Sequence, residues 1–349
     1  MTVLSEALPV DKLGFGIYYG PKMLSAKYAE GKWGPLELKN TGEISIHPGA
    51  KTLHYAQEIF EGLKAYLQKD GSLAMFRPEA NIARMTRSAE MLSMPPFPEA
   101  KFLEGLKSII EASKDFATEA PGALYLRPTM ICTTPSLGVA PGTEYLFYIL
   151  LCPVGGYFGS AHVEKPVEVS VLATDEYVRA VRGGIGSAKT GGNYAASLRA
   201  IQHAKKHGFN NVLFLDAINQ KSLEELGGMN LFIVQNGELQ TPTLTDSILA
   251  GVTRDSILKL ANSMGIKAVE RTITIDELLE GIENSKVEEV FACGTAAVVS
   301  AITELGWKEK RFKVGNGESG PITQTLFQEL TNIHYGKKKA PFPEWMLKV

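Results

Sequence analysis

The chain has 349 residues, of which 44% are hydrophobic and 21% are charged, and its formal net charge is −2. This composition is typical of a soluble globular protein with two domains, and the small net charge gives no electrostatic basis for a nucleic-acid or membrane-surface partner. The N-terminal stretch MTVLSEALPVDKLGFG resembles neither a secretory signal nor a transit peptide. No apolar run approaches the roughly 20 residues of a membrane helix, so we expect a cytoplasmic protein.

The first half of the chain predicts a mixture of helices and strands. HYAQEIFEGL (54–63) has its apolar residues at helical spacing. KAYLQKDGSLAMFRP (64–78) predicts a hairpin, because Asp70-Gly71 can supply the positive φ of a tight turn. PSLGVAPGTE (135–144) predicts a long loop of the kind that often serves a binding site. The other expected elements are helices around 79–93 and 98–116 and buried strands over ALYLRPTMICT (123–133) and EYLFYILLCPV (144–154).

PVGGYFGSAHVEKP (153–166), rich in proline and glycine, is the best candidate for a domain boundary. We expect a small N-terminal domain over 1–152, an interdomain loop over 153–163 and a large C-terminal domain over 164–349. The second half has no regular βαβ series and no GxGxxG motif, which disfavours a dinucleotide-binding fold. Its expected elements are the strand VEVSVLAT, a helix at about 195–207, the strand NNVLFLDA, a hairpin over LFIVQNGELQTP around Asn236-Gly237, a helix from near Thr253 and the strand VEEVFAC (287–293).

The cysteines and histidines give no sign of a metal site or a disulfide framework. Cys132, Cys152 and Cys293 are far apart and lie in apolar stretches, which is typical of buried thiols in a reducing compartment. The six histidines show no HExxH or paired spacing. We therefore expect no metal cofactor.

GGIGSAKTGGNY (183–194) places one lysine, Lys189, among five glycines. It partly fits the phosphate-binding loop G-x-x-x-x-G-K-[ST], although Ala188 occupies the position of the second glycine. The strand NNVLFLDA contains Asp216, which could bind Mg²⁺. Against a nucleotide site, two glycines follow Lys189-Thr190, where a phosphate-binding loop enters a helix and where glycine disfavours one.

Two other interpretations of this loop stay open. Lys189 could be a nucleophile that forms a Schiff base, and the glycines would then give a bound ring room to approach the backbone. Alternatively, the stretch could be a flexible surface loop with a solvated lysine.

A pyridoxal phosphate (PLP) site would need three groups besides the lysine. The pyridine nitrogen needs an acid, the phosphate needs amide, hydroxyl or arginine donors, and the ring O3′ needs a donor. Each candidate also has an ordinary structural interpretation as a surface acid, a helix cap, a packing turn or a solvated arginine, so only their joint presence is informative. The candidates are Glu225 in LEELGGMNLF, Val252 and Thr253 at a helix start, the turn Gly294-Thr295-Ala296, and Arg84 in NIARMTRSAE.

Taken together, these motifs resemble the branched-chain amino acid aminotransferases, which are fold-type IV PLP enzymes. The resemblance covers nearly the whole chain from GFG (14–16) onward. It implies an α+β two-domain fold, with a smaller α/β N-terminal domain and a larger C-terminal pseudo-barrel domain. The most specific stretches are FEGLKAY (60–66), FRPEANIARMTRSA (76–89), LYLRPT (124–129), PSLGV (135–139), LCPVGGYF (151–158), AKTGGNYAAS (188–197), LEELGGMN (223–230), GVTRDS (251–256) and CGTAA (293–297).

The resemblance implies a PLP cofactor bound covalently to Lys189 as the catalytic residue. Tyr194 would donate to the ring O3′, and Glu225 would pair with the protonated pyridine nitrogen. Arg179 matches an arginine of the family's cofactor surroundings. The residues implied to hold the phosphate are Arg84, Val252, Thr253 and Thr295.

The substrate side is also implied by the resemblance. Arg127 and the backbone at Thr295-Ala296 match the region that receives the α-carboxylate, and Arg127 could take the distal carboxylate of glutamate. Val139 matches a residue that reaches the neighbouring subunit's pocket, which implies a homodimer or a larger homo-oligomer. Gly228 stands where several relatives have threonine, next to the substrate. The aromatic wall is implied to comprise Phe15, Tyr55, Phe60, Tyr125 and Tyr157.

The implied reaction is transamination of L-leucine, L-isoleucine and L-valine with 2-oxoglutarate, by ping-pong kinetics, in branched-chain amino acid biosynthesis. A D-amino acid aminotransferase or an aminodeoxychorismate lyase on the same fold are the alternatives, and a non-catalytic PLP-binding protein would lack the lysine or the acid. Ala297 and Ser300 stand where mammalian relatives have a redox-sensitive Cys-x-x-Cys, so no thiol switch is expected.

Overall fold

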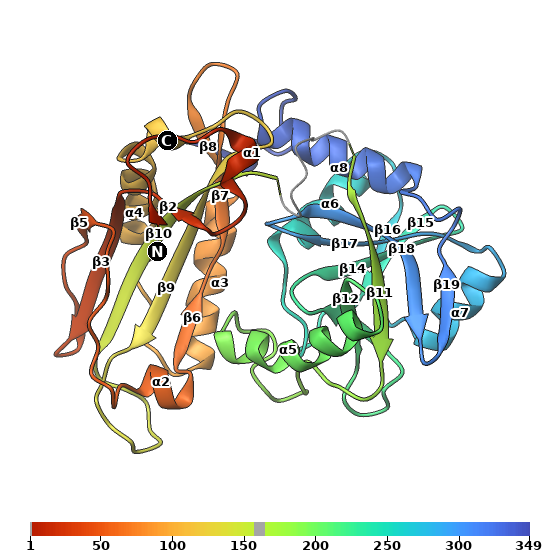
Figure 1. Ribbon diagram of the computed structural model, residues 1–349, viewed down its shortest axis with the longest axis horizontal. Coiled ribbons are helices and arrows are strands. Elements are labelled where there is room, and N and C mark those ends of the chain that lie inside the picture. The colour runs from red at the N-terminus through yellow and green to blue at the C-terminus, as the bar shows by residue number, and fades with distance from the viewer. Residues whose placement is uncertain (1, 157–164) are drawn as a thin grey trace. The chain divides into compact units, whose positions relative to one another are not determined.

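A computed structural model describes residues 2–156 and 165–349, which form two compact units (Figure 1). The first unit comprises Met1–Val163, Ala188–Gly191 and Asn332–Val349, and the second comprises Glu164–Ser187 and Gly192–Thr331. The segment with Lys189 therefore belongs to the first unit, although the chain on both sides of it belongs to the second. The linear domain limits expected from the sequence stay a prediction.

The first unit is built on a nine-stranded antiparallel sheet with the main order β20-β8-β7-β9-β10-β3-β4. β5 pairs with β3, and β6 pairs with β9. β1 (Thr2–Val3) and β2 (Tyr18–Tyr19) form a separate parallel pair. The strands of the large sheet are β3 (Lys22–Ala29), β4 (Lys32–Trp33), β5 (Glu37–Asn40), β6 (Glu58–Phe60), β7 (Leu63–Leu67), β8 (Leu73–Phe76), β9 (Ala123–Cys132), β10 (Tyr145–Val154) and β20 (Met346–Lys348).

The core of the first unit lies between this sheet and two helices, α3 (Pro78–Met91) and α4 (Glu99–Glu111). Ile82 of α3 and Phe102 of α4 pack into the same apolar cluster as Leu124 and Leu126 of β9. Successive side chains of a strand point to opposite faces. Tyr125 and Arg127, which alternate with these two leucines, therefore face away from the core. β9 thus offers Tyr125 and Arg127 to the other face of the sheet. The short helices of this unit are α1 (Val10–Leu13) and α2 (Lys51–Tyr55).

The second unit contains a closed, barrel-like sheet. The strands follow the order β13-β12-β11-β18-β17-β14-β15-β16, with β19 beside β18. An additional pairing of β13 with β14, in which Glu225 lies opposite Asn230, closes the ring. The strands are β11 (Val167–Thr174), β12 (Asn211–Leu215), β13 (Leu223–Leu226), β14 (Asn230–Gln235), β15 (Glu238–Pro242), β16 (Ala268–Arg271), β17 (Val287–Gly294), β18 (Val298–Trp307) and β19 (Lys310–Lys313).

Helices make the connections that the parallel strand pairs of the second unit require. α5 (Gly191–Lys206) joins β11 to its parallel neighbour β12, and α6 (Val252–Ser263) joins β15 to its parallel neighbour β16. α5 buries Ala200 and Ala204 with Phe209 and Phe214, and α7 (Ile275–Glu283) buries Leu278 in the larger cluster of the unit. α8 (Pro321–His334) ends in the segment that belongs to the first unit. None of the helices in the described residues is long and apolar enough to cross a membrane.

The predicted hairpins, and most of the predicted helices and strands, are confirmed. The turns at Asp70-Gly71 and Asn236-Gly237 join β7 to β8 and β14 to β15, with φ of +78° at Gly71 and +72° at Gly237. The three cysteines are buried and unbridged, as expected.

Two expectations about local structure are wrong. The helix expected over 54–63 ends at Tyr55, because Ala56 adopts a left-handed conformation (φ 48°) and the chain then enters β6, which pairs with β9. The two glycines after Lys189-Thr190 were expected to disfavour a helix there, but the helix predicted at about 195–207 is present and already begins at Gly191. There the Gly191 N–H donates to the Glu58 carboxylate, and a side chain at 191 would collide with it. These tertiary contacts outweigh the low helix propensity of glycine.

The first prediction concerns the start of α7, where the Thr274 hydroxyl accepts the Glu277 N–H at 3.1 Å. Thr274→Ala removes this cap and should lower the free energy of unfolding by about 1 kcal/mol. Thr274→Ser keeps the hydroxyl and should lower it by less. Urea denaturation measures both, and equal losses in the two variants would contradict the capping role.

Candidate active site

Lys189 lies in a segment whose backbone is anchored to the first unit. Its N–H donates to the Ser88 hydroxyl at 2.9 Å, and its carbonyl accepts the Phe60 N–H at 2.9 Å. Its ammonium nitrogen lies 5.0 Å from the centroid of the Phe60 ring. Two residues on, the Gly191 amide donates to Glu58, whose pKa is raised by burial. The surface-loop interpretation is therefore wrong at Lys189, because a sheet strand and a helix hold its main chain.

A buried ion pair lies in the same unit. The Glu61 side chain is fully buried and accepts from Arg84 Nε at 2.7 Å, Arg84 Nη2 at 2.8 Å and Asn81 Nδ2 at 2.8 Å. Burial raises the pKa of Glu61, but the charge and hydrogen bonds of Arg84, with smaller contributions from Lys189 and Asn81, bring the pKa below its usual value. Arg84, expected at the phosphate, thus has Glu61 as a partner that the sequence analysis missed, although FEGLKAY contains it.

Four of the predicted substrate residues come together in the first unit. The rings of Phe15 and Tyr125 lie edge to face, with centroids 4.9 Å apart. The Arg127 guanidinium lies 4.9 Å from the Phe60 ring centroid, and Arg127 Nη2 donates to the Tyr125 hydroxyl at 2.9 Å. The result is an aromatic surface with one cationic group, which suits a side chain that is apolar in one substrate and carboxylate-bearing in another.

Tyr55 contacts the predicted 135–144 loop. Its hydroxyl donates to the Leu137 carbonyl, and the Lys51 ammonium donates to the Gly138 carbonyl. Val139, at the tip of this loop, is 86% exposed. Tyr157, the remaining member of the expected aromatic wall, lies outside the described residues.

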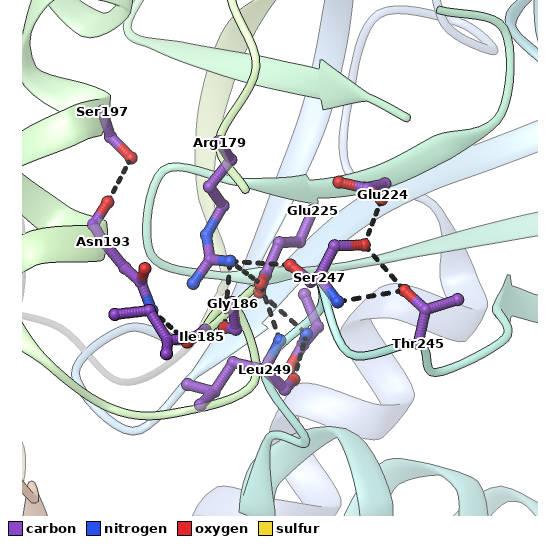
Figure 2. A network of polar contacts seen from close by, with 11 residues as sticks. Arg179, Ile185, Gly186, Asn193, Ser197, Glu224, Glu225, Thr245, Ser247 and Leu249 are labelled. Carbon is purple, nitrogen blue, oxygen red and sulfur yellow. Dashed lines mark hydrogen bonds and ion pairs between the residues drawn. The ribbon is translucent and has the colours of Figure 1, made fainter. Parts of the chain in front are cut away.

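In the second unit, Glu225 is the centre of a buried polar network (Figure 2). Its side chain is 2% exposed and accepts from the Leu249 N–H at 2.8 Å and Asn230 Nδ2 at 3.1 Å. Arg179 Nη1 lies 3.0 Å from Glu225 Oε1 and also donates to the carbonyl of Gly186, at 3.2 Å. The arginine expected near the cofactor therefore pairs with the acid expected to bind its ring nitrogen.

The N-terminus of α6 has the properties of an anion site. Gly251 is its N-cap, and no side chain caps the helix. Val252 and Thr253 stand in the first turn, whose amide groups have no carbonyl partner within the helix and carry the positive end of its dipole. A side chain at Gly251 would collide with the Asn230 amide oxygen. This close approach of the Asn230 side chain explains why position 251 is a glycine.

Three further predicted residues lie in the second unit. Tyr194 is the fourth residue of α5, and a Cβ at Gly228 would stand 3.5 Å from its ring. That is an ordinary van der Waals distance for a Cβ, and glycine leaves this space beside Tyr194 open. Thr295 and Ala296 form the turn between β17 and β18.

The family model described as amino-transferase class IV matches residues 58–305. The chain belongs to this family. This class IV aminotransferase is 45% identical over 341 residues to the branched-chain-amino-acid transaminase 1 of Bacillus subtilis (strain 168), covering 97% of this chain and 95% of that one.

Solved structures agree with this assignment. The branched-chain aminotransferase of Thermoproteus uzoniensis with norvaline is similar with a TM-score of 0.76 and 26% identity, over 94% of this chain and 99% of that chain. The branched-chain amino acid aminotransferase from T.th. with pyridoxamine 5′-phosphate is similar with a TM-score of 0.74 and 26% identity, over 92% and 97%. The predicted family and α+β two-domain fold are confirmed, and branched-chain transamination is favoured over the D-amino acid and lyase alternatives and over a nucleotide site.

The second prediction tests the buried Glu61–Arg84 pair. Arg84→Met leaves a buried carboxylate without its cation and should lower the free energy of unfolding by about 3–5 kcal/mol, whereas the double variant Glu61→Leu/Arg84→Met should lose less. Because the folded-state pKa of Glu61 lies below its ordinary value of 4.5, the pair stabilises fully above about pH 4.5 and less as the pH falls.

Urea denaturation from pH 7 to pH 3 measures both effects. The double variant should lack this part of the acid sensitivity. An Arg84→Met variant as stable as the wild type would show that the pair does not hold the first unit together.

Proposed function

We propose that this chain is a PLP-dependent branched-chain-amino-acid transaminase. It would transfer the amino group of L-leucine, L-isoleucine or L-valine to 2-oxoglutarate, reversibly and by ping-pong kinetics. Relatives with this name are 41–45% identical over most of the chain. The observation that carries the proposal is the buried Glu225 carboxylate, held by Arg179 and the Leu249 amide, in a chain that also anchors Lys189 on both sides.

The residues present fit PLP. Bound PLP would supply a carbonyl carbon that carries the amino group and a protonated ring that withdraws electrons. Glu225 would hold the ring nitrogen, because a buried carboxylate with fixed donors is a strong partner for a cation. Tyr194 would donate to O3′. The proposed phosphate ligands are Arg84, Val252, Thr253 and Thr295, and the open N-terminus of α6 supports this assignment.

Lys189 would have two roles. Its Nζ would hold the cofactor covalently, and as a neutral amine it would act as the base and acid that carries the substrate's α-proton. Covalent binding and proton transfer both require that the Lys189 main chain is held in place, so that its amine can reach the cofactor and the substrate's α-carbon. The hydrogen bonds of Lys189 to Ser88 and Phe60 support that requirement.

Substrate selection would depend on the aromatic surface described above. Phe15, Phe60 and Tyr125 would contact the branched side chain, and Arg127 would receive a carboxylate when glutamate or 2-oxoglutarate binds. A single methylene is worth only about 1–3 kcal/mol in such a pocket, so discrimination among the three branched substrates should be modest. The other proposed substrate contacts are Tyr55, Val139, Tyr157, Gly228 and Ala296.

We also propose that the active form is a homodimer or a larger homo-oligomer. Leu137 and Val139 are 66% and 86% exposed on a loop that Tyr55 and Lys51 hold in place. Exposed apolar side chains on a fixed loop favour burial against another protein surface. The cytoplasmic location and the biosynthetic role stay predictions.

The third prediction tests the reaction. With PLP supplied, the absorbance band of the lysine-bound cofactor should fall on addition of L-leucine, return with 2-oxoglutarate and not respond to D-alanine. Lys189→Ala should reduce kcat/KM for L-leucine by roughly 10²–10⁴-fold or more, because it removes both the covalent link and the proton carrier. Lys205→Ala, an exposed lysine of α5, is the matched control. A band that responds to D-alanine instead would assign the protein to the D-amino acid aminotransferases.

The fourth prediction tests the assembly. Val139→Asp places a charge in the proposed subunit contact, where its burial without a partner is unfavourable, and should shift the protein toward monomers in light scattering. Ile218→Asp makes the same change at an apolar residue that is 71% exposed outside this loop, and should leave the assembly unchanged. A Val139→Asp protein that keeps the wild-type mass would refute the role of the loop.

A further inference from the structure

A second glutamate, Glu224, lies beside the Glu225 network (Figure 2). It is 6% exposed, and its Oε1 accepts a hydrogen bond from the Ser247 hydroxyl. The Ser247 hydroxyl is also 2.7 Å from the Thr245 hydroxyl. Glu224 Oε2 is buried and has no hydrogen-bond partner among the described residues. A carboxylate buried at such a desolvation cost is a candidate for a functional role.

Ser247 connects this glutamate to Arg179. The carbonyl of Ser247 accepts from Arg179 Nη1 at 2.8 Å, and the same nitrogen lies 3.0 Å from Glu225 Oε1. One buried guanidinium is therefore in direct contact with Glu225 and is connected to Glu224 through a single residue.

This arrangement matters because Arg179 and a protonated ring nitrogen would compete for the charge of Glu225. In a buried site a cation beside a carboxylate reduces the attraction of that carboxylate for a second cation. Arg179 and Glu225 alone are a neutral pair, so a ring proton would add an unbalanced positive charge. A second carboxylate near the guanidinium restores the balance.

We propose that Glu224 is a positioning residue that offsets the charge of Arg179 through Ser247, so that Glu225 can hold the proton on the cofactor's ring nitrogen. This inference rests on the proposed function, because it concerns the ring nitrogen of PLP. Glu224 acts on the cofactor only through Ser247, Arg179 and Glu225.

Other charged groups also act on Glu224. Burial raises its pKa, and Asp216 adds to this rise, whereas the Ser247 hydrogen bond, Arg179 and Arg182 lower it; the net pKa is above the usual value. Glu224 therefore loses its charge at a higher pH than an exposed glutamate does. The effect of Glu224 should be largest near neutral pH and should weaken as the solution becomes acidic.

The fifth prediction uses two ligands that differ only at the ring nitrogen. One is PLP, and the other is its carbocyclic analogue, in which C–H replaces the nitrogen. The affinity of each for the cofactor-depleted full-length protein is measured by fluorescence titration at neutral pH. Glu224→Gln should weaken PLP binding about tenfold, the equivalent of one pKa unit at the ring nitrogen, and should leave the affinity for the analogue unchanged.

Two more variants separate this effect from loss of structure. Ser247→Ala removes the hydroxyl that binds Glu224 and keeps the carbonyl that binds Arg179, so it should weaken PLP binding selectively and by less. Glu289→Gln removes another buried carboxylate, which accepts from the Thr323 N–H at 2.7 Å, and should leave the ratio of the two affinities unchanged.

The possible outcomes distinguish the two proposals. A Glu224→Gln variant that binds both ligands as the wild type does, or that weakens both equally, overturns the role of Glu224 and leaves the proposed function standing. A wild-type protein that binds neither ligand overturns the proposed function and this inference with it. Selective loss of PLP affinity supports both.

Discussion

One electrostatic requirement constrains the centre of the polar network in the second unit: a buried carboxylate needs hydrogen-bond donors to keep its charge. Glu225 obtains them from Arg179, the Leu249 amide and the Asn230 side chain. Arg179 and Leu249 are far from Glu225 in the sequence. The pairing of β13 with β14 brings Asn230 opposite Glu225 and at the same time closes the barrel. The pairing that closes the sheet therefore also supplies one of the donors of the acid.

The first unit meets the same requirement with different residues. Glu61 is fully buried, and Arg84 and Asn81 from α3 surround its carboxylate. The neighbouring residue, Phe60, binds the Lys189 carbonyl through its amide. The strand–helix contact that neutralises a buried charge thus adjoins the contact that holds the lysine segment. Each unit thus places a residue of the proposed site in or beside a buried polar cluster, an arrangement that favours the preorganisation that catalysis requires.

Local signals in the sequence were reliable where the structure is local. Asp70-Gly71 and Asn236-Gly237 form the predicted turns because positive φ is a property of the residues themselves. The helix predicted over 54–63 failed for the opposite reason. Its apolar spacing suits a helix, but residues 58–60 form a strand that pairs with residues 129–131 of β9. This pairing depends on a distant segment that the local spacing does not reveal. Likewise, Gly191 begins a helix because Glu58 accepts its amide, a contact that propensity does not describe.

The sequence by itself determined the family, the paired hairpins and the candidate residues Lys189 and Glu225, because short motifs retain residue identity and spacing. It could not show the partners of the buried charges. Glu61, Glu224 and Ser247 were missed as members of polar networks, although two of them lie inside recognised motifs. Whether a glutamate is a solvated surface acid or a buried carboxylate depends on which segments approach it, and only the tertiary structure decides that, because desolvation and pairing are set by distant parts of the chain.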